Sequence, residues 1–294
     1  MKQVLKRPLM RFAQPILRDV RSAIESRIND EAAAQKTLMC QYRLLASMGN
    51  QHLPSFRDVG FRKYSEFDED GILLFIFALI PPINRTCVEI CAGDGRVCNT
   101  TNLIINHGWW GHLFDGKEDL VRAGKSFFAQ HKDTFLYPPR FTQAWITAEN
   151  VNDLILRSGV RGPIDLLSLD IDGMDYWVWK AITVIEPQVV VCETENPIPP
   201  EKALTVPYDP EFVSSKTVDY QGASLAAMYK LGREKGYRLV GAHRFGFNAF
   251  FIRNGVGEAF FPEVEIASCV QDPYSVQARS ERWPLTRDRQ WQEV

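Results

Sequence analysis

The stretch Thr86-Cys-Val-Glu-Ile-Cys-Ala-Gly-Asp-Gly-Arg-Val-Cys-Asn99 decides the fold. Its first half is a short apolar run with β-branched residues, which predicts a buried strand. Gly93-Asp94-Gly95 then breaks the strand, and Thr100–His107 resumes as a helix. Glycine lets the backbone approach a ligand closely, and the N–H groups at the start of a helix face any polar group held in the turn. The stretch therefore predicts a nucleotide-binding corner.

The spacing of the glycines separates two kinds of cofactor. The dinucleotide fingerprint G-x-G-x-x-G requires a third glycine where Cys98 stands, so a nicotinamide oxidoreductase is the second choice. The pattern Glu89-x-x-x-Gly93-x-Gly95 instead resembles the first motif of class I S-adenosylmethionine-dependent methyltransferases, with Cys91 in place of the first glycine. The resemblance implies that S-adenosylmethionine binds at the turn, through Gly93, Asp94 and Gly95, and that Glu89 orients the turn.

A second predicted strand ends in an acid. The run Gly111–Gly116 is short and apolar, and it ends at Asp115, about twenty residues after the glycine turn. Nucleotide-binding α/β folds place a carboxylate there to accept both ribose hydroxyls. We expect Asp115 to have this role; the alternative is that it only begins the turn before the helix at 117–128.

Composition narrows the class of protein. The chain has 294 residues, of which 45% are hydrophobic and 24% charged, as is ordinary for a soluble globular protein. A net charge of −2 shows no excess of basic residues that would indicate nucleic-acid binding. The six cysteines form no C-x-x-C pair, which indicates reduced thiols in a cytosolic protein. No apolar run approaches the roughly twenty residues that span a bilayer, and no signal-peptide cleavage site follows the N-terminal segment.

Residues 1–50 have a helical pattern and are basic at the start. Apolar residues recur every three or four positions from Leu5 to Ile24, and Lys or Arg fill the other faces. Pro8 and Pro15 interrupt the first part. Such a segment can lie on an anionic membrane surface, or it can pack on the domain or on a second subunit.

The segment Tyr64-Ser-Glu-Phe-Asp-Glu-Asp-Gly-Ile72 places three acids just before an apolar helix, which suits capping of that helix. It also resembles the S-Q-x-G-E-D-G-I segment of FkbM-type methyltransferases, with Glu66 and Asp68 as substitutions. In that family the segment closes over the methionine end of the cofactor. The resemblance implies cofactor contacts for Ser65 and Asp70.

Three further strands are predicted to end near the glycine turn. The third is Ala144–Thr147, whose end would present backbone groups of Thr147 and Ala148 to adenine. The fourth, 164–173, ends in Asp170 and Asp172, and the fifth, 188–196, ends in Glu193 and Glu195. Each pair alternates, so on an extended chain its two members project to the same side. In a parallel sheet these ends meet at one edge.

The motif Asp170-Ile-Asp-Gly-Met-Asp175 resembles the D-x-E-G-x-E motif of FkbM-type methyltransferases, and Gly246–Phe251 resembles their closing strand. Together these resemblances cover about residues 62 to 254. They imply methyl transfer from S-adenosylmethionine to a hydroxyl of a sugar or related natural product, as in making a cell-surface glycan or a glycosylated metabolite, and they give Asp170 a place at the cofactor.

A hydroxyl acceptor must lose its proton, and two residues are candidate bases: Asp172 and His243. A divalent metal is the other way to lower the pKa of the hydroxyl. Asp170, Asp172, Glu193 and Glu195 offer hard oxygen ligands suited to Mg²⁺, although they could also bind the hydroxyls of the acceptor directly. Aromatic residues at 109–110 and 176–179 are expected to flank the acceptor, and the proline-rich stretch 197–221 is expected to form a lid over it.

The sequence predicts a Rossmann-like α/β domain of the class I methyltransferase type, with seven mostly parallel strands, helices on both faces, and the last strand antiparallel. We expect a helical N-terminal extension at 1–61, the methyltransferase domain at 62–254, and a C-terminal extension at 255–294. The expected protein is cytoplasmic, with peripheral membrane contact through the basic helix and homo-oligomerisation left open. Two other classes also stay open: a non-catalytic S-adenosylmethionine-binding scaffold and the oxidoreductase.

Overall fold

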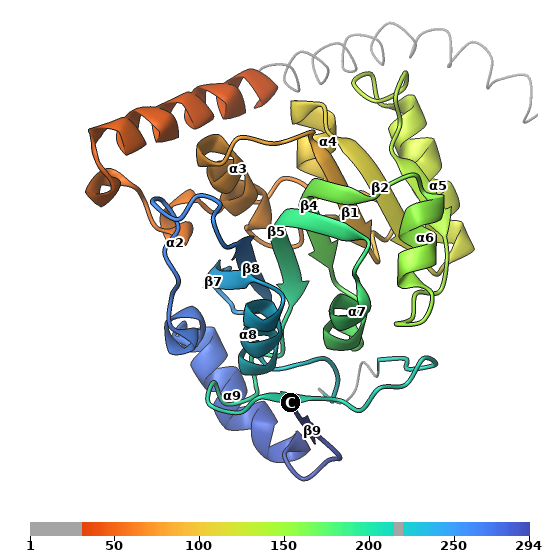
Figure 1. Ribbon diagram of the computed structural model, residues 1–294, viewed down its shortest axis with the longest axis vertical. Helices are drawn as coiled ribbons and strands as arrows, with labels where there is room; N and C mark the ends of the chain where they lie inside the picture. The colour runs from red at the N-terminus through yellow and green to blue at the C-terminus, as the bar shows by residue number, and fades with distance from the viewer. Residues whose placement is uncertain (1–30, 215–219) are drawn as a thin grey trace, which may run out of the picture.

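The computed structural model describes residues 31–214 and 220–294. Its centre is a seven-stranded sheet, with strands β1 (Thr86–Ile90), β2 (Trp110–Asp115), β3 (Arg140–Gln143), β4 (Gly162–Leu169), β5 (Ile185–Glu193), β7 (Tyr237–Ala242) and β8 (Asn248–Arg253). The strand order is β3-β2-β1-β4-β5-β8-β7, and only β8 runs antiparallel to its neighbours in this sheet (Figure 1). This is the topology of class I methyltransferases, so the predicted fold class is confirmed.

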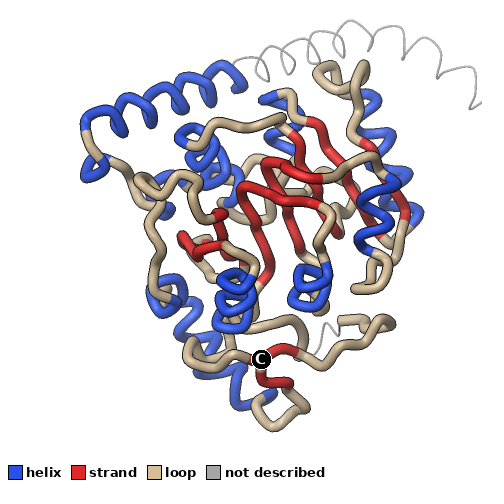
Figure 2. Tube along the Cα trace, in the orientation of Figure 1, coloured by secondary structure: helices blue, strands red, loops and turns tan. Residues whose placement is uncertain are grey.

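Helices cover both faces of the sheet (Figure 2). One face carries α3 (Glu69–Leu79), α4 (Thr101–His107) and α5 (Glu118–Gln130); the other carries α6 (Val151–Arg157), α7 (Asp175–Ala181) and α8 (Leu225–Glu234). Strand residues alternate between the two cores: Val88 and Ile90 belong to one, and Cys87 belongs to the other. This alternation follows from the two-residue period of an extended chain.

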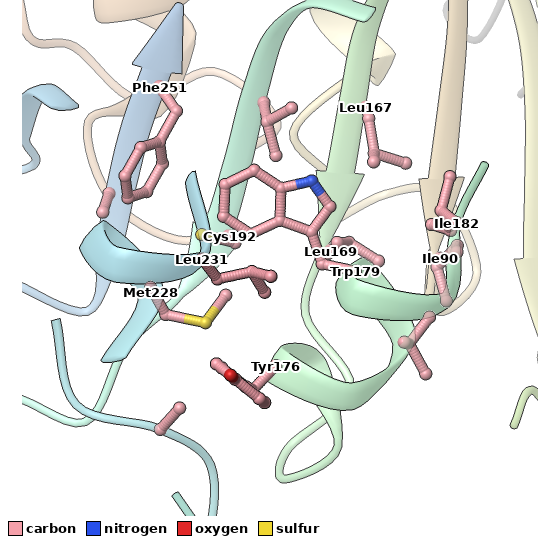
Figure 3. Packing of buried hydrophobic residues seen from close by; sticks show 14 of the residues in the cluster. Ile90, Leu167, Leu169, Tyr176, Trp179, Ile182, Cys192, Met228, Leu231 and Phe251 are labelled. Atoms are coloured by element: carbon pink, nitrogen blue, oxygen red, sulfur yellow. The ribbon is translucent and has the colours of Figure 1, made fainter. Parts of the chain in front are cut away.

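Trp179 is at the centre of the core beneath α7 and α8. Figure 3 shows its indole between Phe251, Leu231 and Leu169, and only 1% of its surface is exposed. Its ring centroid lies 5.1 Å from that of Phe251. Trp179 is therefore a packing residue and does not flank an acceptor.

The third strand was placed wrongly by the sequence. Residues 144–147 are a loop, and β3 is Arg140–Gln143, which pairs with β2 up to the pair Asp115 and Gln143. The apolar run that suggested a strand instead packs outside the sheet, where Ile146 contacts the core and Trp145 is 54% exposed.

Residues 31–48 form a helix that packs on the domain, so this part of the N-terminal extension is helical as predicted. Tyr42 contacts Phe75 of α3 with ring centroids 4.8 Å apart, and Gln35 Nε2 donates to Asn102 Oδ1 at 3.0 Å. The basic segment 1–30, with its predicted membrane contact, lies outside the described residues. Within the described ranges, no helix has both the length and the apolar character to cross a membrane.

The C-terminal residues lie against the segment predicted to be a lid, of which residues 197–214 and 220–221 are described and are called the lid below. After β8 the chain forms η2 (Ile266–Val270), α9 (Pro273–Thr286) and β9 (Gln292–Glu293). Strand β9 pairs antiparallel with β6 (Leu204–Thr205) inside the lid. The short elements η1 (Asn50–His52) and α2 (Phe56–Val59) connect the N-terminal helix to α3.

Candidate functional site

The glycine turn lies at the carboxyl ends of the parallel strands, called the carboxyl edge below. Gly93 and Gly95 both have positive φ, 56° and 72°. Among the described residues, a Cβ on Gly93 would meet no atom closer than 4.0 Å, whereas a Cβ on Gly95 would lie 2.6 Å from the ring of Phe128. Gly93 thus leaves open space above the turn, and Gly95 allows α5 to pack.

Asp115 lies next to Gly93. Its Oδ2 accepts the N–H of Gly93 at 2.9 Å, and its Oδ1 accepts the N–H of Lys117 at 2.8 Å. A carboxylate offers about four acceptor positions, so two remain for hydroxyl groups. The side chain is largely buried, with 7% of the residue exposed. Two residues that were 22 positions apart in the sequence are therefore in direct contact.

Glu89 is buried beneath the start of α4. Its carboxylate accepts the N–H groups of Asn99 (2.9 Å) and Thr100 (2.8 Å) and lies 2.8 Å from Cys98 Sγ. A carboxylate at this end of a helix is stabilised by the helix dipole. Glu89 therefore holds the far side of the turn, and whether this orients a cofactor stays a prediction.

Two other residues shape the turn. Cys91, which stands where the methyltransferase motif has its first glycine, has φ of 64°, a conformation that glycine adopts more readily. Asp94 turns its side chain toward Arg96, whose N–H donates to Asp94 Oδ1 at 3.0 Å. The predicted cofactor contact of Asp94 is not tested by this geometry.

Three acids meet at the carboxyl edge beside the turn. Asp170, Asp172 and Glu193 each offer a carboxylate oxygen, and these atoms all lie within 4.8 Å of one another. The prediction that Asp170 and Asp172 alternate on an extended strand was wrong, because β4 ends at Leu169 and Asp172 has φ of 54°. Asp175 causes the turn: its carboxylate accepts the N–H groups of Ile171 (2.9 Å) and Gly173 (3.2 Å).

Glu195, the fourth acid of the predicted set, is not a member of this group among the described residues. Strand β5 ends at Glu193, and the N–H of Glu195 donates to Ala223 O at 2.8 Å. The chain has left the sheet at this point, so the predicted alternation does not continue.

The acids of the group repel one another. Burial raises the pKa of Asp170 well above its usual value, and the charges of Asp175 and Asp172 add to this increase. Burial likewise raises the pKa of Glu193, with Asp170 as the next cause. Glu193 Oε2 is buried and has no hydrogen-bond partner in the described part of the chain. A cation or a shared proton would relieve this arrangement.

We expect Glu193→Gln to stabilise the protein at neutral pH. The pKa of Glu193 is higher in the folded protein than in the unfolded chain. At a pH between these two pKa values the folded protein keeps the proton, whereas the unfolded chain has released it. Stability is therefore lost as the pH rises from that value toward the folded-state pKa. The melting temperature of the variant should exceed that of the wild type by about 2–4 °C at pH 7.5, and the gap should narrow at pH 5.

The control is Glu186→Gln, at the other end of the same strand, where the side chain is 64% exposed and pairs with Arg253 at 3.1 Å. We expect no comparable stabilisation from it. An equal melting temperature for Glu193→Gln and the wild type at both pH values would show that the Glu193 carboxylate does not destabilise the folded protein.

The segment 63–70 is fixed by Asp70. Its Oδ2 accepts the N–H groups of Lys63 (2.7 Å), Tyr64 (2.6 Å) and Ser65 (2.8 Å) and the hydroxyl of Ser65 (2.9 Å). Burial raises the pKa of Asp70 to about 6. The N–H of Cys98 donates to Tyr64 O at 2.8 Å, which joins this segment to the glycine turn. Ser65 and Asp70 thus position the segment, and their own contact with a cofactor stays a prediction.

The two candidate bases have different surroundings. His243 is fully buried, its Nδ1 accepts the N–H of Phe245 at 2.9 Å, and its Nε2 lies 3.6 Å from Glu69 Oε1. Burial lowers the pKa of His243 to about 4, so the ring is neutral at pH 7. Asp172, in contrast, is exposed.

The lid contacts the loop that follows β3. The N–H of Ala148 donates to Tyr208 Oη at 3.1 Å, and Trp145 Nε1 donates to Pro210 O at 2.8 Å. The N–H of Thr147 donates to Asn150 Oδ1 at 2.9 Å. Thr147 and Ala148 therefore lie beyond the end of β3, and their N–H groups already have partners within the protein.

The aromatic residues divide between the two ends of the sheet. Trp177 Nε1 donates to Val206 O of the lid at 2.9 Å. Trp110 begins β2, so Trp109 and Trp110 lie at the opposite end of the strand from Asp115, and the expectation that they flank the acceptor was wrong.

A role of Asp175 in shaping the site was not predicted from the sequence. Its position at the start of a helix, shortly after Asp170 and Asp172, was the available signal.

No protein-family model matches this sequence. No curated protein matches it either. Solved structures with a similar fold include magnesium protoporphyrin IX methyltransferase (ChlM) from Synechocystis PCC 6803 with bound SAM, at 12% identity and TM-score 0.38, covering 63% of this chain and 78% of that chain.

Two further examples have comparable scores. The CcbJ methyltransferase from Streptomyces caelestis matches at 14% identity and TM-score 0.39, covering 63% of this chain and 89% of that chain. The N-terminal domain of EvdMO1 with SAH bound matches at 12% identity and TM-score 0.41, covering 74% of this chain and 94% of that chain. At these identities and TM-scores, the similarity assigns neither an activity nor a site residue to this chain.

Proposed function

We propose that the protein is an S-adenosylmethionine-dependent methyltransferase that methylates a hydroxyl of a sugar or glycan-type natural product. The observation that carries the proposal is the contact between Asp115 and Gly93, which leaves two carboxylate acceptor positions beside the open side of the turn. The resemblance of residues 170–175 to the FkbM motif supports a hydroxyl acceptor.

The residues at the carboxyl edge fit the cofactor chemically. Asp115 would accept the ribose hydroxyls, and the absent side chain of Gly93 would allow close approach. Burial favours the neutral forms of Asp170 and Glu193, and a cationic sulfonium bound beside them would favour their charged forms, which would in turn attract it. When bound, S-adenosylmethionine supplies an electrophilic methyl group on sulfur.

The remaining work of the protein is to position the acceptor and to keep water out. The close packing of Phe212 of the lid on Gly173, where a Cβ would lie 2.3 Å from its ring, supports a role of the lid in this. We assign proton removal to Asp172, which is exposed and lies at the acid group. His243 is the second candidate, and its burial argues against direct contact with an acceptor.

A divalent metal is part of the proposal as a cofactor for lowering the pKa of the hydroxyl. Asp170, Asp172 and Glu193 would hold Mg²⁺ with part of its water shell retained. We expect Mg²⁺ at ten times its dissociation constant to raise the melting temperature by about 3 °C in the wild type and not in Asp172→Asn. Activity that is unchanged by EDTA, with no shift in the wild type, would remove the metal from the proposal.

Calorimetric titration tests the cofactor. We expect heat on adding S-adenosylmethionine or S-adenosylhomocysteine to the full chain and none on adding NAD. Binding of NAD alone would favour the oxidoreductase, for which the sequence lacks the third glycine.

Turnover tests catalysis. We expect S-adenosylhomocysteine to accumulate when the protein is incubated with S-adenosylmethionine and glycan extracts. Binding of S-adenosylmethionine without turnover in any extract would favour the non-catalytic scaffold.

A further inference from the structure

A groove with cationic side chains lies between the helix at 31–48, the helices α3 and α4, and the connection that leads into β1. Its volume is about 350 Å³, and it is lined by Lys36, Arg43 and Arg85 together with Phe77 and Trp109. Among the residues that the structure describes, no Asp or Glu lines it. A groove that gathers cations without a carboxylate has the chemistry of an anion site.

The cations of the groove are available to a ligand. Within residues 31–214 and 220–294, no carboxylate lies within ion-pair distance of Lys36 or Arg85. Arg43 uses its Nε to donate to Ala78 O at 2.8 Å, which leaves its terminal nitrogens without that bond. After burial, the charges of Lys36 and Arg85 are the causes that lower the pKa of His107 to about 4, so both cations lie close to the same ring.

Exposed aromatic and aliphatic side chains adjoin the groove. Phe135, Leu136 and Tyr137 are 55%, 73% and 70% exposed, and Trp110 is 52% exposed. These four residues are called the aromatic patch below. The ring centroids of Trp110 and Tyr137 are 5.1 Å apart. The N–H of Trp110 donates to Arg85 O at 2.8 Å, so the patch and the groove share a boundary.

The aromatic patch and the groove lie at the end of the sheet opposite the proposed active site. Trp110 begins β2, and the loop at 131–139 returns from α5 to β3 at the same end. In Figure 1 this loop and the helix at 31–48 are at the upper edge, whereas α9 and β9 are at the lower edge. A partner on this surface would therefore not cover the carboxyl edge.

The composition of residues 1–30 indicates what kind of partner binds this surface. Residues 1–30 contain seven Lys or Arg and three Asp or Glu, and they join the described chain five residues before Lys36. Exposed Trp and Tyr favour the headgroup level of a membrane, and clustered cations are attracted to anionic lipid. We propose that the aromatic patch and the groove form a docking surface for an anionic membrane.

Co-sedimentation of the full chain with lipid vesicles tests the proposal. We expect binding to vesicles of phosphatidylcholine mixed with phosphatidylserine, weaker binding at high salt, and little binding to phosphatidylcholine alone. Replacing Phe135, Leu136 and Tyr137 together by Ser should lower the partition constant about tenfold. Lys36→Gln and Arg85→Gln should each lower it about fivefold.

Leu285→Ser is the matched control for Leu136→Ser, because Leu285 is 74% exposed and lies on α9 at the far end of the molecule. We expect Leu136→Ser to weaken binding and Leu285→Ser to leave it unchanged, with wild-type melting temperatures for both. Equal effects of the two changes, no sedimentation of the wild type, or full binding by the Lys36 and Arg85 variants would each overturn the proposal.

Discussion

Asp115→Asn is expected to weaken binding of S-adenosylmethionine about 100-fold. The amide keeps one oxygen in place of two, so it cannot hold both the backbone N–H groups of Gly93 and Lys117 and a pair of ribose hydroxyls. Hydrogen bonds to a charged group contribute about 1.5–3 kcal/mol, and a loss of about 3 kcal/mol is about 100-fold in affinity. Calorimetric titration measures the change directly.

Asp153→Asn is the control for this prediction. Asp153 lies on α6 with its side chain 72% exposed, and it forms only a surface ion pair with Arg157 at 4.0 Å. Such pairs contribute little, so we expect wild-type affinity. If Asp115→Asn bound S-adenosylmethionine as tightly as Asp153→Asn does, Asp115 would not be the residue that binds the ribose hydroxyls.

Gly71→Ala is expected to destabilise the protein by about 4 kcal/mol. Gly71 lies in α3, and a Cβ there would be 2.2 Å from Val59 O and 2.4 Å from Phe61 N. Both atoms belong to the backbone, and the N–H of Gly71 also donates to Phe61 O at 3.1 Å. The chain at 59–61 would have to move away from α3, which we expect to lower the melting temperature by about 8 °C.

Gly108→Ala separates this clash from the general effect of losing a glycine. Gly108 ends α4 with φ of 66°, and a Cβ there would meet no atom within 4 Å. The expected destabilisation of Gly108→Ala is therefore only that of the left-handed backbone conformation, about 1–2 kcal/mol. Similar melting temperatures for the two variants would mean that the close approach of 59–61 to α3 is not the reason for glycine at position 71.

The α/β sheet could be predicted because the apolar runs with β-branched residues alternate with helical patterns along the chain, and the resemblance to class I methyltransferases implied its strand order. The ends of the strands could not be predicted in the same way. Asp175 turns the chain by accepting two N–H groups four and two residues before it, and an alternating pattern of acids contains no sign of this turn. Alternation therefore misplaced Asp172 on a strand and assigned Glu195 to a group that it does not join.

Site residues were predictable where topology alone brings them together. Parallel strands end at Asp115 and Glu193, and Gly93 and Asp170 follow the ends of two others. The shared edge of the sheet therefore determines the proximity of these residues. The burial of His243 depends on packing against Phe67 and Phe247, with ring centroids 5.0 and 5.8 Å away. The contact with Phe67 joins segments more than 170 residues apart in the sequence, which a local pattern cannot reveal.

The pairing of β6 with β9 sets an order in which the protein can assemble. Every strand of the large sheet has been synthesised by Arg253, whereas the partner of Leu204 and Thr205 is made only at Gln292 and Glu293. Domains begin to fold while the ribosome is still adding residues. The nascent chain can therefore complete the large sheet and its glycine turn first, and β6 can pair with β9 only after residue 293 has been synthesised.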